Sequence, residues 1–192
     1  MAEAVQSLRG NDPRPLLILR DCNGCKNKEG DLVQRTLADE RFLIGTHWFN
    51  CVKLPAEVIE EDHPLNSLFR GSKPAHVLVA TNDAKTIVSV SRFGKKEIWK
   101  AMSRVLRKDY EKNPESAMKG MMKLLAKYDA LDERENVVRA QMKAKQDKGK
   151  ERRVALLQKE LDKLAEQRKE LGEEEEKIRA LELRHAEESE EA

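Results

Sequence analysis

The sequence predicts an α/β domain with a mixed sheet and flanking helices, followed by a long helical extension. All six Phe and Trp residues lie before residue 100, and the last proline is Pro114. Beyond that point Ala, Glu, Lys, Arg, Leu, Gln and Met dominate, a composition typical of long helices. Short β-prone runs alternate with helical patterns only before it. We therefore expect a globular domain over residues 1–110 and a helical coiled-coil tail over residues 111–192.

Length and charge set limits on the class of protein. A domain of about 110 residues can bury roughly two-thirds of its unfolded surface, which is enough for one small core. The net charge of +2 indicates no particular partner. The longest apolar runs, such as residues 16–19 and 77–80, are too short to span a bilayer, and residues 1–15 lack the apolar core of a secretory signal. We expect a cytoplasmic protein with no membrane partner.

The first half of the domain is expected to alternate helices and strands. A short helix over residues 3–9 should end at the turn residues that follow it. The apolar run Leu16–Leu19 comes after a proline and is typical of a strand buried on both faces. Apolar residues then recur at roughly helical spacing from Asn23 to Phe42. The β-prone residues from Ile44 to Val52 predict a second strand.

The second half of the domain predicts a hairpin and a closing helix. Residues 56–69 are irregular or helical and are interrupted by Pro64. Residues 76–90 have the pattern of a β-hairpin that turns at Asn82 and Asp83. A helix is expected over residues 95–110, with one apolar face formed by Ile98, Met102, Val105 and Leu106. Strands separated by helices early, followed by a late hairpin, predict a mixed sheet with helices on both faces.

Two cysteines follow the first expected strand directly, in the motif Cys22-Asn23-Gly24-Cys25. A thiolate is the nucleophile of disulfide exchange, and a free thiol with a pKa of ~8.5 is mostly protonated at neutral pH. Unpaired amides at a helix N-terminus stabilise the thiolate, and a Cys-x-x-Cys arrangement can bring the pKa to about 3.5–7.5. Cys22 is the expected attacker, and Cys25, one turn further, is placed to resolve the mixed disulfide. In the cytoplasm such a pair favours redox or metal chemistry over a structural disulfide.

Together with the order of elements around it, this motif resembles the thioredoxin fold. Pro74, directly before the strand that opens the hairpin, stands where that family has a cis-proline facing the cysteines. The hairpin and the closing helix follow in the family's order, and the resemblance covers about residues 3–108. It implies thiol–disulfide exchange with protein clients, with Lys73 and Pro74 contributing to the substrate groove.

The motif also departs from the family pattern. Arg20 and Asp21 stand where an aromatic residue often precedes the first cysteine, and Asn-Gly replaces the familiar Gly-Pro. Lys73 occupies a position where the family usually has an uncharged β-branched residue. Asp21 would oppose thiolate formation, whereas a nearby Lys73 would favour it. The redox potential and the substrate class therefore stay open, as does whether Pro74 is cis or an ordinary trans proline.

A metal site or an idle pair of thiols are the alternatives for the two cysteines. Zinc usually takes four nitrogen or sulfur ligands. The remaining candidates are irregularly spaced and fit no zinc signature; they are Cys51, His47, His63 and His76. We expect no metal and no cofactor. Cys51 is expected to be a small buried apolar residue of the second strand.

The tail has the apolar spacing of packed helices and a segregated charge. Val154, Leu157, Leu161 and Leu164 follow the alternation of a coiled-coil seam, and Gly149 is the candidate break before them. Lys and Arg dominate residues 139–153, whereas Glu dominates residues 170–192. A turn at Gly149 would bring the acidic end back toward Lys119, Lys123 and Lys127. A helical hairpin, an antiparallel dimer and a single long helix all remain open, because one glycine costs a helix only about 1 kcal/mol.

Two functions follow from these patterns. The first is thiol–disulfide exchange by Cys22 and Cys25, with the tail serving oligomerisation or the docking of a coiled-coil partner. The rival is a non-catalytic scaffold of thioredoxin fold whose coiled coil mediates protein–protein interaction. The basic stretch of the tail suits nucleic acid or another acidic partner. Since no stacking aromatics are interleaved with it, we expect no nucleic-acid partner.

Overall fold

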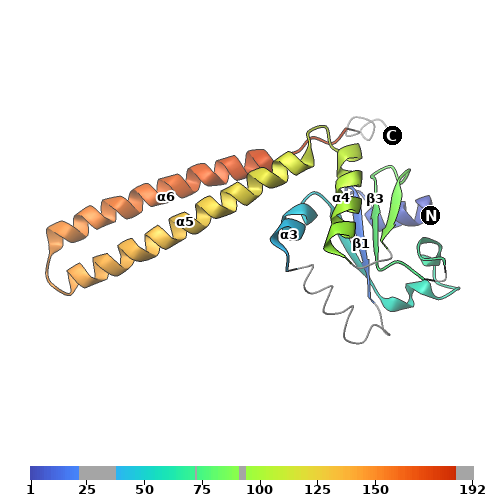
Figure 1. Ribbon diagram of the computed structural model, residues 1–192, viewed down its shortest axis with the longest axis horizontal. Coiled ribbons are helices and arrows are strands. Elements are labelled where there is room, and N and C mark those ends of the chain that lie inside the picture. Colours follow the sequence, from blue (N-terminus) through green and yellow to red (C-terminus); the bar gives the residue numbers. More distant parts are fainter. Residues whose placement is uncertain (22–37, 72, 91–93, 185–192) are drawn as a thin grey trace. The chain divides into compact units, whose positions relative to one another are not determined.

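A computed structural model describes residues 1–21, 38–71, 73–90 and 94–184 (Figure 1). The chain divides into two compact units, which are described separately here. The first comprises Met1–Met118 together with the segment that begins at Leu181, and the second comprises Lys119–Ala180. The first unit thus extends past the boundary expected near residue 110.

A four-stranded mixed sheet forms the centre of the first unit. Its strands are β1 (Leu16–Arg20), β2 (Asn50–Leu54), β3 (Val77–Ala80) and β4 (Ile87–Val90). They lie in the order β2-β1-β3-β4, with β1 parallel to β2 and antiparallel to β3. The β3–β4 pair is the predicted antiparallel hairpin. The predicted α/β class with a mixed sheet is confirmed.

Helices cover both faces of the sheet, as predicted. Helix α1 (Ala2–Arg9) and two short 3-10 helices, Ala56–Ile59 and Asn66–Leu68, pack on one face. Their core includes Ile18 and Leu78. Helix α4 (Lys95–Asp109) packs against β3 and β4 and buries the predicted apolar face. No residue of α4 belongs to the core that α1 forms with the sheet. Because successive residues of a strand point to opposite faces of a sheet, α4 covers the face opposite to α1.

The strand predicted from Ile44 to Val52 is wrong in its first half. Residues Glu40–Thr46 form helix α3, and β2 begins only at Asn50. The reason is a helix N-cap that the β-prone composition concealed: the Asp39 carboxylate accepts a hydrogen bond from Arg41 N at 3.1 Å. Most of the helical pattern expected from Asn23 to Phe42 lies outside the described residues.

Cys51 is exposed, which corrects the expectation of a buried apolar residue. Among the strands that the structure describes, β2 lies at the edge of the sheet and pairs with β1 alone. Its side chains alternate in exposure, so that Cys51 and Lys53 share the more exposed side. A sequence pattern shows alternation but does not show which of the two sets faces the core.

The chain returns to the first unit after the tail. Leu183 forms an antiparallel bridge with Tyr110, and Glu111 N donates to Glu182 O at 3.0 Å. Arg184 N donates to Asp109 O at 2.8 Å. The first unit is therefore completed by residues that lie far apart in the sequence.

The tail is a hairpin of two long helices, one of the three arrangements that the sequence left open (Figure 1). Helix α5 spans Pro114–Gln146 and helix α6 spans Glu151–Arg179. Val138, Leu161 and Leu164 form a core between them. Ion pairs flank this core, including Lys127–Glu174 at 2.8 Å and Arg134–Glu160 at 2.8 Å. The acidic end thus folds back onto α5, which is what the charge pattern favoured for a chain that turns at Gly149.

Two glycines of the hairpin are expected to respond in opposite directions to alanine. Gly149 lies in the turn with φ +62°, a left-handed conformation, so Gly149→Ala should destabilise the hairpin by about 1–2 kcal/mol. Gly172 lies within α6, and a Cβ there would meet only the Tyr128 hydroxyl at 3.9 Å. Gly172→Ala should stabilise by about 0.5–1 kcal/mol. Urea unfolding followed by far-UV circular dichroism measures both; changes of the same sign would contradict the assigned turn.

Candidate functional site

The cysteines of the predicted site, Cys22 and Cys25, lie outside the described residues. The structure describes the chain up to Asp21, directly before the motif. Arg20 N donates to His76 O at 2.8 Å, and Asp21 N donates to Leu54 O at 2.9 Å. The chain is therefore held by β3 on one side and β2 on the other at the point where it enters the motif.

Pro74 lies beside this end of β1. In the antiparallel register of β1 with β3, Leu19 pairs with Val77, and residues 74–76 continue past Arg20 and Asp21. None of the peptide bonds in the described ranges is cis, so the bond between Lys73 and Pro74 is trans. This answers the question that the resemblance left open. Lys73 is exposed, and Pro74 is half-buried.

Arg20 fastens the Pro74 segment to β1 with hydrogen bonds to several acceptors. Its Nε donates to Ala75 O at 3.1 Å, and Nη1 donates to Asp21 O at 2.9 Å. Its Nη2 donates to Pro74 O at 3.4 Å and to His76 Nδ1 at 3.2 Å. A planar guanidinium can reach acceptors in several directions at once, which suits it to holding two segments together.

The burial of Arg20 is the feature that sequence reasoning missed. The residue is only 6% exposed, and its guanidinium carbon lies 5.9 Å from the centroid of the Phe69 ring, a cation–π contact. Buried arginines are uncommon without partners that satisfy them. One feature of the sequence could have indicated this burial: Arg20 directly follows the apolar run Leu16–Leu19 and so belongs to a strand that is buried on both faces.

Asp21 is paired with a cation. Its carboxylate lies 2.9 Å from the Lys53 ammonium, and both side chains are largely exposed. An exposed pair of this kind contributes about 0–1 kcal/mol to stability. The pair nonetheless reduces the negative charge that Asp21 places beside the cysteine motif, the charge expected to oppose a thiolate.

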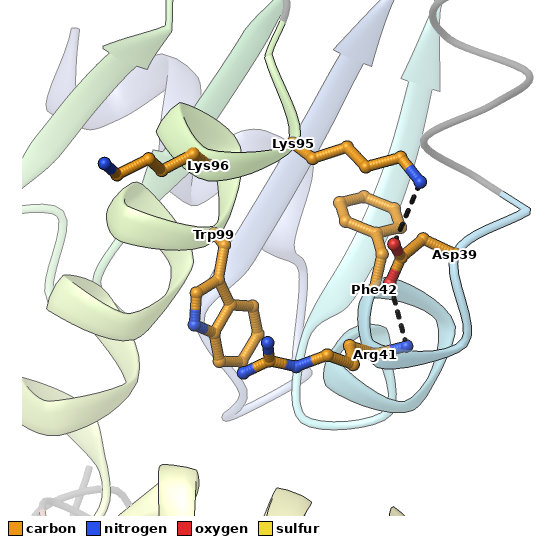
Figure 2. A pocket seen from close by; sticks show the side chains of 6 residues that line it. All are labelled: Asp39, Arg41, Phe42, Lys95, Lys96 and Trp99. Carbon is orange, nitrogen blue, oxygen red and sulfur yellow. Dashed lines mark hydrogen bonds and ion pairs between the residues drawn. The ribbon is translucent and has the colours of Figure 1, made fainter.

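A pocket of about 290 Å³ lies between the N-terminal turns of α3 and α4 (Figure 2). Phe42 and Trp99 supply its aromatic wall, and the Arg41 guanidinium lies 5.7 Å from the centroid of the Trp99 ring. Lys95 donates to the Asp39 carboxylate at 3.0 Å and holds the pKa of that carboxyl below its usual range. The lining is completed by Lys96, so the pocket has three cations and one carboxylate.

The two helices meet closely at one end of this pocket. A Cβ on Gly45 of α3 would lie 3.0 Å from the Met102 Cε atom and 3.0 Å from the Trp99 Cζ3 atom. Any side chain on residue 45 would press on the ends of these two side chains, so glycine fits closely where α3 touches α4. The pocket's chemistry suits an apolar group next to an anion, because its aromatic wall is flanked by more positive than negative charge.

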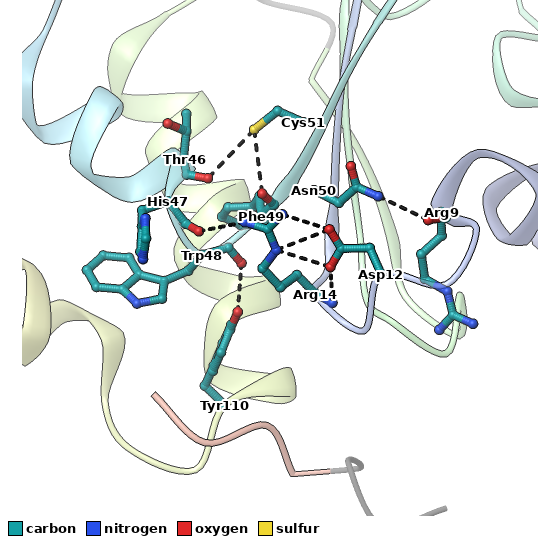
Figure 3. A network of polar contacts seen from close by, with 10 residues as sticks. All are labelled: Arg9, Asp12, Arg14, Thr46, His47, Trp48, Phe49, Asn50, Cys51 and Tyr110. Carbon is teal, nitrogen blue, oxygen red and sulfur yellow. Dashed lines mark hydrogen bonds and ion pairs between the residues drawn. The ribbon is translucent and has the colours of Figure 1, made fainter. Parts of the chain in front are cut away.

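A polar network lies at the other end of β1, near Pro15 (Figure 3). Arg14 pairs with Asp12 at 2.7 Å and donates to His47 O at 3.0 Å. The Tyr110 hydroxyl donates to Trp48 O at 2.9 Å, and burial raises the pKa of that hydroxyl far above its ordinary value. These contacts join loops at the start of β1, whereas the cysteine motif follows its end.

Within the described ranges, no three His, Cys, Asp or Glu side chains come together as metal ligands. The same ranges contain no helix with the length and apolar character needed to cross a membrane. No model of a known family matches the chain, and no curated protein or solved structure matches it significantly.

Proposed function

We propose that the first unit is a thioredoxin-like domain that carries out thiol–disulfide exchange through Cys22 and Cys25. One observation carries the proposal. Arg20, two residues before Cys22, donates through its side chain to Pro74 O and Ala75 O, so the segment of Pro74 is held beside the point where the chain enters the motif. The resemblance rests on such a proline near the cysteines.

The sheet gives further support to the proposal. The order β2-β1-β3-β4, with β1 and β2 parallel and a closing antiparallel hairpin, is the arrangement expected of a thioredoxin-like domain. Helix α4 follows the hairpin, as the resemblance requires. The trans bond before Pro74 is a departure from the family, which has a cis-proline facing the cysteines.

The proposed reaction proceeds in two exchanges. The Cys22 thiolate attacks one sulfur of a client disulfide, forms a mixed disulfide and releases the other client sulfur as a thiolate. The Cys25 thiolate then attacks the Cys22 sulfur, and the second client thiolate leaves. Two electrons and two protons pass to the client, and Cys22 and Cys25 end as a disulfide. Lys73 and Pro74 are proposed to contact the client, a protein in a reducing compartment such as the cytoplasm.

A second candidate is a scaffold without redox chemistry, in which the hairpin binds a protein partner. The specific observation in its favour is that α5 and α6 possess their own core and form a compact unit of their own. The unusual residues around the motif, Arg20-Asp21 and Asn23-Gly24, agree with either function.

Replacing Cys22 separates the two candidates. We expect wild-type protein to catalyse the reduction of insulin disulfides by a small dithiol, and Cys22→Ser to lose this activity. Cys51→Ser removes an exposed thiol far along the sequence from the motif and should retain wild-type turnover. The thiol pKa of Cys22, measured by the pH dependence of alkylation, should lie below ~8.5. An inert wild type with an ordinary thiol pKa would leave the scaffold as the better account.

A further inference from the structure

A groove of about 340 Å³ lies between strand β4 and helix α4 in the first unit. Val88–Val90 line it from β4, and Glu97, Lys100 and Arg104 line it from α4. Among the described strands β4 is the last in the sheet order, so the groove borders an open edge of the sheet. It is called the β4 groove below, and it joins a strand edge to the solvent side of a helix.

The backbone of β4 offers hydrogen-bonding groups along this edge. Thr81 N donates to Thr86 O at 2.9 Å, which places Thr86 in a hydrogen-bonded pair with the neighbouring chain. Bonded and non-bonded pairs alternate in an antiparallel ladder. Val88 is therefore bonded to β3, whereas Ile87 and Ser89 direct their N–H and C=O groups outward. An extended chain beside β4 would satisfy these groups as an added strand.

The α4 side of the β4 groove is basic. Lys100 and Arg104 are exposed, lie one helical turn apart and form no ion pair with any described residue; they are called the groove cations below. Glu97 is the acidic residue of the lining. Its carboxylate folds back over Gly94 at the start of α4, because a Cβ built on that glycine would overlap it. The groove therefore favours an acidic ligand.

The described part of the chain ends beside this groove. Arg184 N donates to the carbonyl of Asp109, the last residue of α4, at 2.8 Å. Lys108 donates to the Thr86 hydroxyl at 2.7 Å, so this end of α4 lies next to the start of β4. At 1.5 Å per residue, the groove cations lie about 8 and 14 Å from Asp109 along the helix. A chain that continues from Arg184 along β4 would meet them in turn.

The sequence that follows Arg184 is acidic. Residues 185–192 read His-Ala-Glu-Glu-Ser-Glu-Glu-Ala, with four glutamates and no lysine or arginine. In extended form, at about 3.3 Å per residue, eight residues span roughly 26 Å, which is enough to pass both groove cations. Alternate side chains then share a side, so Glu188 and Glu190 lie about 6.6 Å apart on one side. That separation matches the about 6 Å between helix residues four positions apart.

We propose that residues 185–192 bind in the β4 groove of the same chain, in extended form and running in the direction of β4. Glu188 pairs with Arg104. Glu190 pairs with Lys100, and the backbone of the segment bonds to the open edge of β4. The tether from Arg184 is only a few residues long, and a short tether gives an effective concentration of about 1 mM or more, so weak contacts suffice. This docking does not depend on the thiol chemistry.

Amide hydrogen exchange of the full chain, followed by NMR, tests the occupancy of the groove. We expect the Ile87 and Ser89 amides to exchange at least about fivefold faster in Lys100→Glu with Arg104→Glu than in wild type. The reversed charges by themselves repel hydroxide and slow exchange, so they do not mimic this effect. The Val88 amide lies inside the ladder and should stay protected in both proteins, which shows that the sheet is intact. Equal exchange at Ile87 and Ser89 would overturn the proposal.

A matched control places the same charge change beside the pocket of Figure 2. Arg41 and Lys96 are exposed residues of that pocket. Arg41→Glu with Lys96→Glu should leave exchange at Ile87 and Ser89 as in wild type. An equal loss of protection in this control would mean that the segment responds to the net charge of the unit and not to the β4 groove, and would overturn the proposal.

The assigned register is tested on the segment itself. Glu188→Gln with Glu190→Gln should speed exchange at the β4 edge at least about threefold, because both ion pairs are lost. Glu187→Gln with Glu191→Gln removes the same charge from the outward side and should have a smaller effect. Glu188→Lys with Glu190→Lys should restore protection to the chain whose groove cations are reversed. Equal effects of the two glutamine pairs, or failure of this restoration, would contradict the register.

The dependence on protein concentration identifies the source of the segment. Binding within one chain predicts the same protection at about 50 and about 500 µM protein. Protection that rises with concentration would assign the groove to residues 185–192 of a second copy and overturn binding within the chain. Since exchange at β4 does not report disulfide reduction, failure here leaves the insulin assay unaffected, and the reverse also holds.

Discussion

Replacing Arg20 by methionine is expected to lower the free energy of unfolding by about 2–4 kcal/mol. Methionine fills a similar volume but supplies none of the hydrogen bonds that Arg20 donates to the carbonyls of Asp21, Pro74 and Ala75. These acceptors lie beside a side chain that is 6% exposed, where water replaces a lost donor poorly. Removing one partner of a buried polar group costs more than the net value of the hydrogen bond.

Tryptophan fluorescence during urea unfolding measures this effect, because both tryptophans, Trp48 and Trp99, belong to the first unit. Arg41→Met is the matched control. Arg41 also lies over an aromatic ring, that of Trp99, but it is exposed, so its loss should cost less than about 1 kcal/mol. Equal effects of the two substitutions would mean that Arg20 does not fasten the Pro74 segment.

Replacing Tyr110 by phenylalanine is expected to cost about 1–2 kcal/mol at neutral pH and to remove an alkaline loss of stability. At neutral pH the variant lacks the hydrogen bond that the Tyr110 hydroxyl donates to Trp48 O. In the wild type, burial raises the pKa of Tyr110, so the native state keeps this proton at pH values where the unfolded state releases it.

The pH dependence follows from that difference in pKa. The contribution of Tyr110 is fully present below the unfolded pKa of about 10 and falls as the pH rises above it, by about 1.4 kcal/mol per pH unit. The stability advantage of the wild type over Tyr110→Phe should therefore be constant from pH 7 to about pH 9 and shrink above about pH 10. Urea unfolding of both proteins across this range measures it. Taking the difference cancels the titration of Tyr128 and the lysines; a difference independent of pH would contradict the burial of this hydroxyl.

Much of the fold could be predicted because its signals are local. The strand at Leu16–Leu19, the hairpin and the buried face of α4 each follow from a pattern of a few neighbouring residues. The error at Ile44–Val52 arose where two local signals competed. There the N-cap at Asp39 outweighed the β-prone composition that follows it.

The contacts around the candidate site could not be predicted from the sequence. Arg20 was recognised only as a departure from a family pattern, because its acceptors on Pro74 and Ala75 lie about 55 residues further along the chain. The pairing of Asp21 with Lys53 also depends on β1 and β2 lying side by side in the sheet, although the two residues are far apart in the sequence. Such pairings follow from sheet register, which a single sequence does not specify.

The sequence by itself determined the class of each segment: a mixed α/β unit, a helical tail, and a Cys-x-x-Cys motif after a buried strand. These properties depend on composition and short periodicity, which are set by residues close together in the chain. Only the tertiary structure decided that Arg20 holds the Pro74 segment beside the entrance to that motif. It also decided that Leu183 returns to Tyr110 and that the two helices of the tail pack as a hairpin. Each of these depends on contacts between residues far apart in the sequence, and such contacts form only when the whole chain packs.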